Sequence, residues 1–403
     1  MSSSKILIVA SNFPPVRGGS ASVYASLASK VRETIVVLAP MFDYADGLPL
    51  IGWREHDRST PYRVVRVPLL RTVLIGVPIR RKWMWRLQDL WIRTRVLSAV
   101  LREIISSNVR CVCVGELVAS GWLLKLLRWF PGITTAVYVH GEEITTSLSS
   151  ETERGRIRSS LIASDIIIAV SRFTLDITAG LVGPEYRSRI TLIQNGVDVE
   201  KFFPGDASAA LRADYGLQSD IFIFISVSRL VEKKGHDKAI MAFKTVVQEF
   251  PDTLFLIVGD GPYRGTLERI VDRLELASQV RFVGSVPEDE LADHYKLGNV
   301  FIMPNRALPD GDTEGFGLVF LEANGCGLPV IAGQDGGSLE AVTDGFNGLT
   351  VNGNSETDVS AAMLRLRRDA ALRATLKANG LVRARAFDWR SRADVFLKLC
   401  KPS

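Results

Sequence analysis

The chain has 403 residues, 47% of them hydrophobic and 23% charged, which excludes disordered and fibrous classes and leaves room for two domains. Lysine and arginine exceed aspartate and glutamate by 49 to 44, too small a bias to indicate nucleic acid as a partner. No apolar run approaches the roughly 18 residues of a membrane-spanning helix. The apolar run Ile6–Ala10 stops at Ser11-Asn12, so we do not expect a signal peptide, and the cysteines lack zinc-site spacing. We therefore expect a cytoplasmic protein with reduced thiols.

Short apolar segments alternate with longer helical patterns through the first half of the chain. Their β-branched runs predict strands at Lys5–Ala10, Thr34–Leu38, Arg63–Val67, Val109–Val114, Thr134–Val139, Asp165–Val170 and Ile190–Ile193. The helical patterns between them include Ser20–Lys30, Arg81–Ile105 and Val118–Trp129. Continuously apolar strands separated by helices are typical of a parallel sheet that is covered on both faces.

The alternation stops at an irregular segment, Val197–Gly216, which we expect to be a linker, and then restarts. The second half predicts strands at Ile221–Val227, Thr253–Val258, Val280–Val283, Val300–Met303 and Pro329–Ala332. Its helical patterns include Asp237–Phe250, Tyr263–Leu274, Asp289–Leu297, Glu356–Arg368, Ala370–Ala386 and Trp389–Leu399. The expected fold is α/β, with two doubly wound, Rossmann-like units facing across a cleft and ligands beyond the carboxyl ends of the strands.

Two segments of the first half follow strands and carry groups suited to a ligand. The segment Ser11–Ser20 contains Gly18-Gly19, whose free amides suit a phosphate or an attacking hydroxyl, and Ser20 is expected to cap the next helix. A plain Gly-Gly turn is the alternative, because the G-x-G-x-x-G spacing is absent. His140 follows the strand Thr134–Val139 and precedes a glycine, and a structural histidine is the alternative to a ligand-binding one.

Cations follow the strand Ile221–Val227, at the point where a parallel sheet binds its ligands. Arg229 and Lys234 are predicted to hold a diphosphate, the arginine through its planar fork and the lysine as a point charge. A solvated basic loop is the alternative. It suits Lys233 better than Arg229, which comes directly out of a buried strand.

The segment Asp312–Ala323 carries the most specific pattern in the sequence. Gly315-Phe316-Gly317 predicts a turn that presents backbone amides at a helix N-terminus. Glu322 is a carboxylate in an otherwise apolar helix and needs a partner that this helix does not supply. Glu314 lies about 12 Å from it at helical rise, beyond the roughly 5–9.5 Å of a glycosidase pair, so hydrolysis is disfavoured. We interpret Asp310-Gly311-Asp312 as a turn and not as a metal site.

The segment Ile79–Arg95 is basic, aromatic and helical in period. Trp83, Leu87, Leu90 and Trp91 fall on one face, and the cations around them are Arg80, Arg81, Lys82, Arg86, Arg93 and Arg95. We interpret the segment as an interfacial helix for anionic lipid and a lipid-linked acceptor. The alternative is an amphipathic helix that packs its tryptophans and leucines on the sheet and leaves its arginines in water.

Taken together, these segments resemble the GT-B glycosyltransferases, specifically the retaining family 4 group that includes bacterial phosphatidylinositol mannosyltransferases. The residues that carry the resemblance are Phe13-Pro14-Pro15, Gly18-Gly19, His140-Gly141-Glu142, Asn195-Gly196-Val197-Asp198, Arg229, Lys234-Gly235, Val258-Gly259-Asp260-Gly261-Pro262, and Glu314 with Glu322. They occur in the right order along nearly the whole chain. Arg-x4-Lys combined with Glu-x7-Glu is the most diagnostic part.

The resemblance implies a role for each matching residue. Arg229 and Lys234 would neutralise the diphosphate of the donor, Glu314 would bind sugar hydroxyls, and Glu322 would bind the ribose. The backbone around the sugar and phosphate would come from Gly18, Gly19, Phe316, Gly317, Leu318 and Val319. His140 would lie near the 6-hydroxyl of the sugar, and the segment ending at Val286 would hold the base through its backbone.

The resemblance also implies domains at residues 1–196 for the acceptor and 197–386 for the nucleotide sugar, with 387–403 as a terminal helix that crosses back. The implied activity is retaining, metal-independent transfer of a hexose, with mannose from GDP-mannose as the leading version, to a lipid-linked or saccharide acceptor. No cofactor is expected besides the nucleotide sugar as donor substrate. The expected location is the cytoplasm, at the inner face of an anionic membrane.

Three alternatives stay open at this point. A UDP-sugar donor fits the same motifs, because a base held by backbone leaves little trace in the sequence. A nucleotide-sugar epimerase or hydrolase would need a water-activating base, for which Glu142 and Glu143 are the candidates. A non-catalytic nucleotide-sugar-binding protein is disfavoured, because it would be expected to lack one of Arg229, Lys234 and Glu314.

Overall fold

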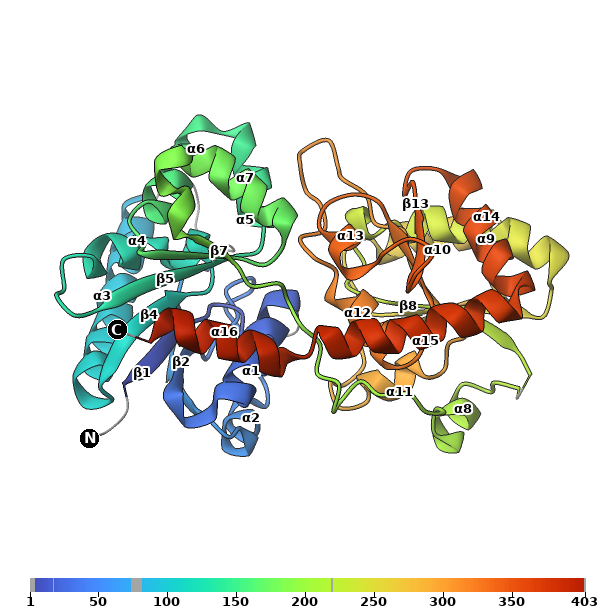
Figure 1. Cartoon of the computed structure of the whole chain (residues 1–403), viewed down its shortest axis with the longest axis horizontal. Helices are drawn as coiled ribbons and strands as arrows, with labels where there is room; N and C mark the ends of the chain where they lie inside the picture. Colours follow the sequence, from blue (N-terminus) through green and yellow to red (C-terminus); the bar gives the residue numbers. More distant parts are fainter. Residues whose placement is uncertain (1–3, 17, 74–81, 219, 402–403) are drawn as a thin grey trace. The chain divides into compact units, whose positions relative to one another are not determined.

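The computed structural model describes residues 4–16, 18–73, 82–218 and 220–401. The chain forms two compact units (Figure 1): unit 1 contains the residues up to Gln194 and those from Trp389 onward, and unit 2 contains Asn195–Asp388. Each unit is built on its own parallel sheet with helices packed on its faces. The expected α/β fold with two Rossmann-like domains is therefore confirmed.

The sheet of unit 1 has the strand order β3-β2-β1-β4-β5-β6-β7, and its neighbouring strands run parallel. Its strands are β1 (Lys5–Val9), β2 (Ile35–Pro40), β3 (Arg63–Val67), β4 (Val109–Val114), β5 (Thr134–Val139), β6 (Ile166–Ala169) and β7 (Ile190–Leu192). Its helices are α1 (Gly19–Val31), α2 (Trp53–Ser59), α3 (Lys82–Ser106), α4 (Leu117–Leu127), α5 (Glu142–Thr145), α6 (Glu151–Leu161), α7 (Arg172–Val182) and α16 (Trp389–Cys400). The seven strands predicted for this half are all present.

Two layers of helices bury the sheet of unit 1. Apolar side chains of α3, α4, α6 and α7 pack in one core cluster with the strands. On the other face α1 and α16 pack against each other (Figure 1), and the ring of Tyr138 lies 5.9 Å from Tyr24 and 6.1 Å from Phe396. The strand order reverses between β1 and β4, so the loops after β1, β4 and β5 meet where such a sheet binds ligands.

The sheet of unit 2 has the order β10-β9-β8-β11-β12-β13 and is also parallel. Its strands are β8 (Phe222–Val227), β9 (Thr253–Val258), β10 (Val280–Gly284), β11 (Val300–Met303), β12 (Val330–Gly333) and β13 (Gly348–Val351). Its helices are α8 (Ala209–Asp214), α9 (His236–Glu249), α10 (Arg264–Arg273), α11 (Leu291–Tyr295), α12 (Leu318–Gly325), α13 (Ser338–Ala341), α14 (Glu356–Arg368) and α15 (Ala370–Ala386). The short strand β13 was not predicted, and α8 lies inside the segment expected to be an irregular linker.

The sheet of unit 2 is also covered on both faces. Apolar side chains of α9, α10 and α14 form one core cluster with the strands. On the other face, Phe301 of β11 lies with its ring 5.8 Å from that of Tyr295 in α11 and 5.7 Å from that of Phe320 in α12. The order reverses between β8 and β11, which places the loops after these two strands at the ligand-binding edge.

Candidate active site

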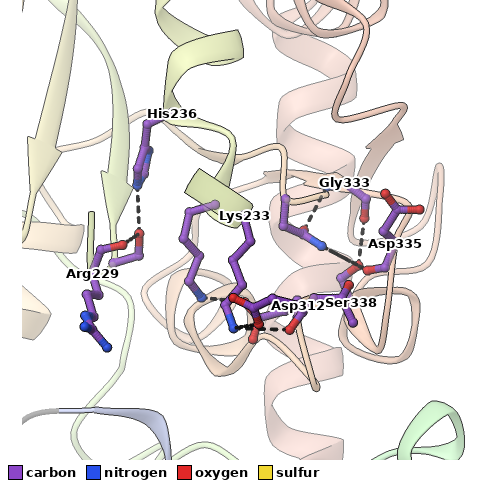
Figure 2. Close-up of polar contacts among 12 residues, drawn as sticks. Arg229, Lys233, His236, Asp312, Gly333, Asp335 and Ser338 are labelled. Carbon is purple, nitrogen blue, oxygen red and sulfur yellow. Dashed lines mark hydrogen bonds and ion pairs between the residues drawn. The ribbon is translucent and has the colours of Figure 1, made fainter. Parts of the chain in front are cut away.

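Arg229 and Lys234 lie on one loop directly after β8. The Arg229 side chain is exposed, and no hydrogen bond or ion pair joins its guanidinium to the residues that the structure describes (Figure 2). Lys234 forms an ion pair with Glu314, from the loop after β11. The buried His236 supports this loop, because its Nε2 lies 2.8 Å from the Ser228 hydroxyl. Burial, together with the charge of Lys234, lowers the pKa of His236 to about 4, so this histidine is neutral at pH 7.

Glu314 is an ionised carboxylate in a shielded position. Its side chain is 13% exposed and that of Lys234 is 15% exposed. Burial alone would raise the pKa of Glu314, but the charge and hydrogen bond of Lys234, with smaller contributions from Lys233 and the Gly317 N–H, lower it below the ordinary value. The structure therefore brings together two residues that the sequence analysis selected separately, 80 positions apart.

Lys233 is not the solvated loop residue that the sequence analysis allowed. Its ammonium lies 2.6 Å from Asp312 Oδ1 and donates to the Thr313 carbonyl at 3.3 Å (Figure 2), and its side chain is 11% exposed. The Asp310 carboxylate accepts from the Asp312 N–H at 3.0 Å, which is turn chemistry as expected. Asp312, however, has a partner that local sequence could not reveal, because it comes from 79 residues earlier in the chain.

The turn before α12 has the predicted form. Gly317 precedes the helix with φ of 84°, and a Cβ there would lie 2.6 Å from the Phe320 ring. Only glycine adopts this conformation without strain. Phe316 is buried, and the amides of Leu318 and Val319 begin the helix. A helix start with free amides suits an anionic or hydroxyl-bearing ligand.

Glu322 receives the partner that its own helix does not supply. The Tyr295 hydroxyl of α11 donates to Glu322 Oε2 at 2.7 Å. The pKa of Glu322 is about 7, mainly because burial raises it. The Tyr295 hydrogen bond opposes this rise, and the nearby charge of Glu288 adds to it. Sequence analysis did not identify Tyr295, since neither its position within a helix nor its spacing from Glu322 signals the contact.

The loops after β9 and β10 complete the ligand-binding edge of unit 2. Gly259 has φ of 129°, and a Cβ there would meet the Ser228 carbonyl at 1.9 Å, so the β8 and β9 loops pack backbone to backbone. Its N–H donates to the Gly284 carbonyl at 2.8 Å. Val286 follows two residues after the end of β10 and is partly buried.

In unit 1, the glycine loop leads into α1 in a different way from that predicted. The helix begins at Gly19, with Gly18 at the capping position and no side-chain cap, so the prediction that Ser20 caps this helix was wrong. The Ser20 hydroxyl instead accepts a hydrogen bond from the Asn12 amide at 3.3 Å. Gly18 and Gly19 are both exposed, and a Cβ built on either would meet nothing within 4 Å.

His140 lies at the carboxyl end of β5 and is held by aromatic and polar neighbours. Its Nε2 lies 2.6 Å from the Tyr24 hydroxyl, which donates to the Gly115 carbonyl at 2.6 Å. The hydroxyl has a single proton, so His140 donates from Nε2 and its Nδ1 carries the lone pair. Burial lowers the pKa of His140 to about 4. The Glu143 carboxylate accepts from the His140 backbone N–H at 2.8 Å.

Sequence analysis missed Glu116, which follows β4 at the same edge. Its Oε2 accepts from the Ser11 N–H at 2.7 Å and from the Ser11 hydroxyl at 3.0 Å. Burial raises the pKa of Glu116 to about 7 against these hydrogen bonds, and the charge of Glu143 adds to the rise. Burial likewise raises the pKa of Glu143 to about 7. The available signal was a carboxylate directly after the buried strand Val109–Val114.

The helix α3 exposes its aromatic face. Trp83, Leu87, Leu90 and Trp91 are 63%, 58%, 62% and 52% exposed, while Ile92, Val96 and Val100 pack in the core of unit 1. The alternative in which the tryptophans and leucines pack on the sheet was therefore wrong. Arg86 and Arg95 are exposed on the same helix. Arg80 and Arg81 lie outside the described residues, and α3 begins at Lys82.

In residues 4–16, 18–73, 82–218 and 220–401, no group of three His, Cys, Asp or Glu side chains could hold a metal ion. None of the helices over the same residues has the length and apolar character needed to cross a membrane.

Solved structures share this architecture at low sequence identity. Alr3699/HepE from Anabaena, in complex with UDP and glucose, has a TM-score of 0.75 at 20% identity with 98% of each chain covered. Sucrose-phosphate synthase from Thermosynechococcus elongatus has a TM-score of 0.77 at 22% identity, again with 98% of each chain covered. These likenesses show that the chain has the two-domain fold of these proteins, with a parallel sheet in each domain.

Sequence comparison gives the family. The model for Glycosyltransferase Family 4 matches residues 51–201, and that for Glycosyl transferases group 1 matches residues 208–383. The chain is 32% identical over 394 residues to the GDP-mannose-dependent alpha-(1-6)-phosphatidylinositol monomannoside mannosyltransferase of Mycolicibacterium smegmatis, with 96% of each chain covered. It is 34% identical over 219 residues to a D-inositol 3-phosphate glycosyltransferase of Kribbella flavida, covering 52% of this chain and 50% of that one. The chain belongs to the family 4 glycosyltransferases.

Proposed function

We propose that this glycosyltransferase moves mannose from GDP-mannose to a lipid-linked or saccharide acceptor, with retention of configuration and without a metal ion. The observation that carries the proposal is the 32% identity over 96% of both chains to a relative named as GDP-mannose-dependent. Unit 2 supplies the charges that a nucleotide-diphosphate sugar requires: an exposed Arg229, and Lys234 beside the ionised Glu314.

The donor roles follow from these charges. Arg229 and Lys234 hold the diphosphate, with backbone amides at the start of α12 beside it. Glu314 accepts hydrogen bonds from sugar hydroxyls, since an ionised carboxylate is a strong acceptor for such groups. Glu322, whose pKa is about 7, forms hydrogen bonds with the ribose hydroxyls. The backbone near Val286 holds the base. Two cations and a helix N-terminus neutralise the diphosphate, which is the task a divalent metal performs in other transferases.

The proposed chemistry is substitution on one face of the sugar. The bond between the anomeric carbon and the phosphate oxygen breaks, and Arg229 and Lys234 stabilise the negative charge on the departing diphosphate. The acceptor oxygen bonds to the anomeric carbon, and its proton passes to the departing phosphate oxygen. Glu314 is engaged by Lys234 and Glu322 by Tyr295, so neither carboxylate stands free to act as a nucleophile.

We further propose that unit 1 binds the acceptor. Exposed Gly18 and Gly19 and the neutral His140 suit hydroxyl groups, which in this proposal are those of the donor sugar, as the resemblance implies, and of the acceptor that attacks it. The exposed apolar stripe of α3, flanked by Arg86 and Arg95, suits the surface of an anionic membrane that carries a lipid acceptor. The protein would then act as a peripheral protein at the inner face of the membrane.

A transfer assay tests the donor, the metal and the stereochemistry together. Purified protein is incubated with radiolabelled GDP-mannose or UDP-glucose, membrane lipid extract and EDTA, and the anomeric configuration of the product is read by NMR. We expect an α-mannosyl product from GDP-mannose that forms in EDTA and is lost in Arg229→Met. Lys238→Met is the matched control, because Lys238 pairs with Glu356 at 2.9 Å on the surface. Transfer only from UDP-glucose would refute the proposed donor, and a β product would refute retention of configuration. Sugar release without an acceptor would refute transfer in favour of hydrolysis.

Liposome flotation tests the membrane role of α3. We expect binding to vesicles rich in anionic lipid, and loss of binding in the double variant Trp83→Ser/Trp91→Ser. Trp129→Ser is the matched control, because Trp129 is 77% exposed but lies just after α4. Equal loss in the control, or unchanged binding in the double variant, would contradict this assignment.

A further inference from the structure

The segment that carries Glu314 has no regular secondary structure to hold it. It runs from the end of β11 at Met303 to the start of α12 at Leu318, and its residues 304–317 form only turns, bends and irregular backbone. A loop of this length has many conformations, so its order must come from contacts with its neighbours. A sugar-binding carboxylate needs such order, because small displacements weaken a directed hydrogen bond.

Lys233 contacts this loop near its beginning and near its end. The Arg306 N–H donates to the Lys233 carbonyl at 2.8 Å, near the beginning of the loop. The Lys233 ammonium then reaches the end of the loop, where it lies 2.6 Å from Asp312 Oδ1 and 3.3 Å from the Thr313 carbonyl (Figure 2). A single residue thus joins two points of the loop to the loop after β8.

Other contacts support the loop from the side of β12. The Asp335 carboxylate accepts from the Ala307 N–H at 2.9 Å, and the Gly337 N–H donates to the Glu314 carbonyl at 2.8 Å. These hydrogen bonds fix the backbone of the loop at Ala307 and at Glu314. The ion pair of Lys233 adds the contact that fixes the loop beside Lys234, the partner of the Glu314 carboxylate.

The two adjacent lysines pair with different carboxylates of the same loop. The Lys233 side chain is 11% exposed, and its ammonium is occupied by a carboxylate and a carbonyl of the loop. Lys234 follows in the same 3-10 turn, Glu232–Lys234, and pairs with the carboxylate two residues beyond Asp312. Because neighbouring cations contact neighbouring points of one loop, moving the first contact would move the second.

We propose that Lys233 is a positioning residue: held by Asp312, it fixes the loop so that Glu314 and Lys234 are correctly placed for a nucleotide sugar. This inference rests on the proposed function and assigns the tasks of the two lysines. Lys234 binds the ligand, and Lys233 aligns the loop that binds the sugar. The loss of Lys233 should then impair recognition of the sugar more than that of the diphosphate.

Four variants test the inference: Lys233→Met, Asp312→Asn, the double variant, and Lys233→Arg. We expect Lys233→Met and Asp312→Asn each to lower kcat/KM for GDP-mannose about tenfold, or about 1.4 kcal/mol, while the Kd for GDP changes less than twofold. The double variant should lose no more than either single variant, since both remove one interaction. Lys233→Arg should keep most of the activity, because a guanidinium also pairs with Asp312.

Direct phosphate binding by Lys233 would give the opposite pattern. Lys233→Met would then raise the Kd for GDP by the same factor as it lowers kcat/KM, and Asp312→Asn would tighten GDP binding by releasing the ammonium. Either result would overturn the inference. So would a lowered melting temperature with unchanged kcat/KM, which indicates a merely structural ion pair.

A second measurement does not depend on activity. Hydrogen exchange of ligand-free protein should be faster across residues 306–316 in Lys233→Met and Asp312→Asn, and unchanged there in the control Lys238→Met. Unchanged exchange in the first two variants would overturn the inference. If the wild-type protein transfers sugar from no nucleotide donor, the proposed function fails, and the exchange data still decide whether Lys233 holds the loop.

Discussion

Replacing Lys234 by methionine should destabilise unit 2 strongly at neutral pH. The substitution keeps most of the apolar stem of the side chain and removes the ammonium that pairs with Glu314. Breaking a buried ion pair by removing one partner costs about 3–5 kcal/mol. The two side chains here are 13% and 15% exposed, and Lys233 and the Gly317 N–H remain beside Glu314. We therefore expect a loss of about 2–3 kcal/mol at pH 7.

The pH dependence of this loss follows from the pKa of Glu314. In the wild type, that pKa lies below the ordinary value of 4.5, so ionised Glu314 stabilises the folded state above pH 4.5. This contribution disappears as the pH falls through the folded-state pKa. In Lys234→Met, only Lys233 and the Gly317 N–H oppose the effect of burial on Glu314, so the pKa of Glu314 rises. Folding of this variant then favours the protonated form of Glu314. The difference between the two proteins should shrink steadily between pH 7 and pH 4.

The assay must separate the two units. All seven tryptophans lie in unit 1, so tryptophan fluorescence follows that unit and serves as an internal control. Urea unfolding of unit 2 is followed by hydrogen exchange coupled to mass spectrometry, at pH 7 and pH 4.5. The double variant Lys234→Met/Glu314→Gln should recover more than half of the loss, and Lys238→Met should lose less than about 0.5 kcal/mol. A Lys234→Met protein as stable as the wild type at pH 7, or one whose deficit at pH 4.5 is as large as that at pH 7, would refute the reasoning.

Three further predictions follow from individual contacts. Tyr24→Phe removes the hydroxyl that joins Gly115 to His140 and should cost unit 1 about 1–2 kcal/mol, read as a lower urea midpoint by tryptophan fluorescence; an unchanged midpoint would contradict it. Glu116 has a pKa of about 7, raised from 4.5, so folding favours its protonated form and stability falls as the pH rises from 4.5 through 7. Glu116→Gln should reduce this fall in the free energy of unfolding between pH 4.5 and pH 7 by about 1–2 kcal/mol. A fall equal to that of the wild type would exclude Glu116 as its source. Gly317→Ala should lower the melting temperature and weaken GDP binding in calorimetry, because its Cβ would lie 2.6 Å from a phenylalanine ring at φ of 84°; normal binding would show that the turn can relax.

Most strands of the two sheets were predictable because their residues are largely apolar and often β-branched over three to six consecutive positions. The strand β13 differs, since its four residues Gly348–Val351 stand among glycines and asparagines and gain order by pairing with β12. Its existence depends on a neighbour rather than on its own sequence. The helix α8 was missed inside the expected linker for a related reason, because six residues carry too little periodicity to recognise.

Most residues of the candidate site could be predicted from the sequence, but several of the contacts between them could not. Residues that follow buried strands, such as Arg229 and His140, were recognisable by position. The contacts of Lys233 with Asp312 and of Tyr295 with Glu322 join positions 79 and 27 residues apart, and no local pattern encodes them. Ser20 shows that a good capping residue need not be used, because the helix begins at Gly19 and its capping position is Gly18, two residues before Ser20.

The ionisation states of the two units differ in a way that suits the two substrates proposed for them. In unit 2, Lys234 and Lys233 keep Glu314 ionised, and Arg229 is exposed without a partner among the described residues. Glu314, Lys234 and Arg229 thus present full charges, as a diphosphate and a directed sugar hydroxyl require, whereas Glu322 in the same unit has a pKa of about 7. In unit 1, burial raises the pKa of Glu116 and lowers that of His140, so the histidine is neutral at pH 7 and the carboxyl is close to its point of half-ionisation. This contrast between Glu314 and Glu116 supports the proposed assignment of a charged donor to unit 2 and of a hydroxyl acceptor to unit 1.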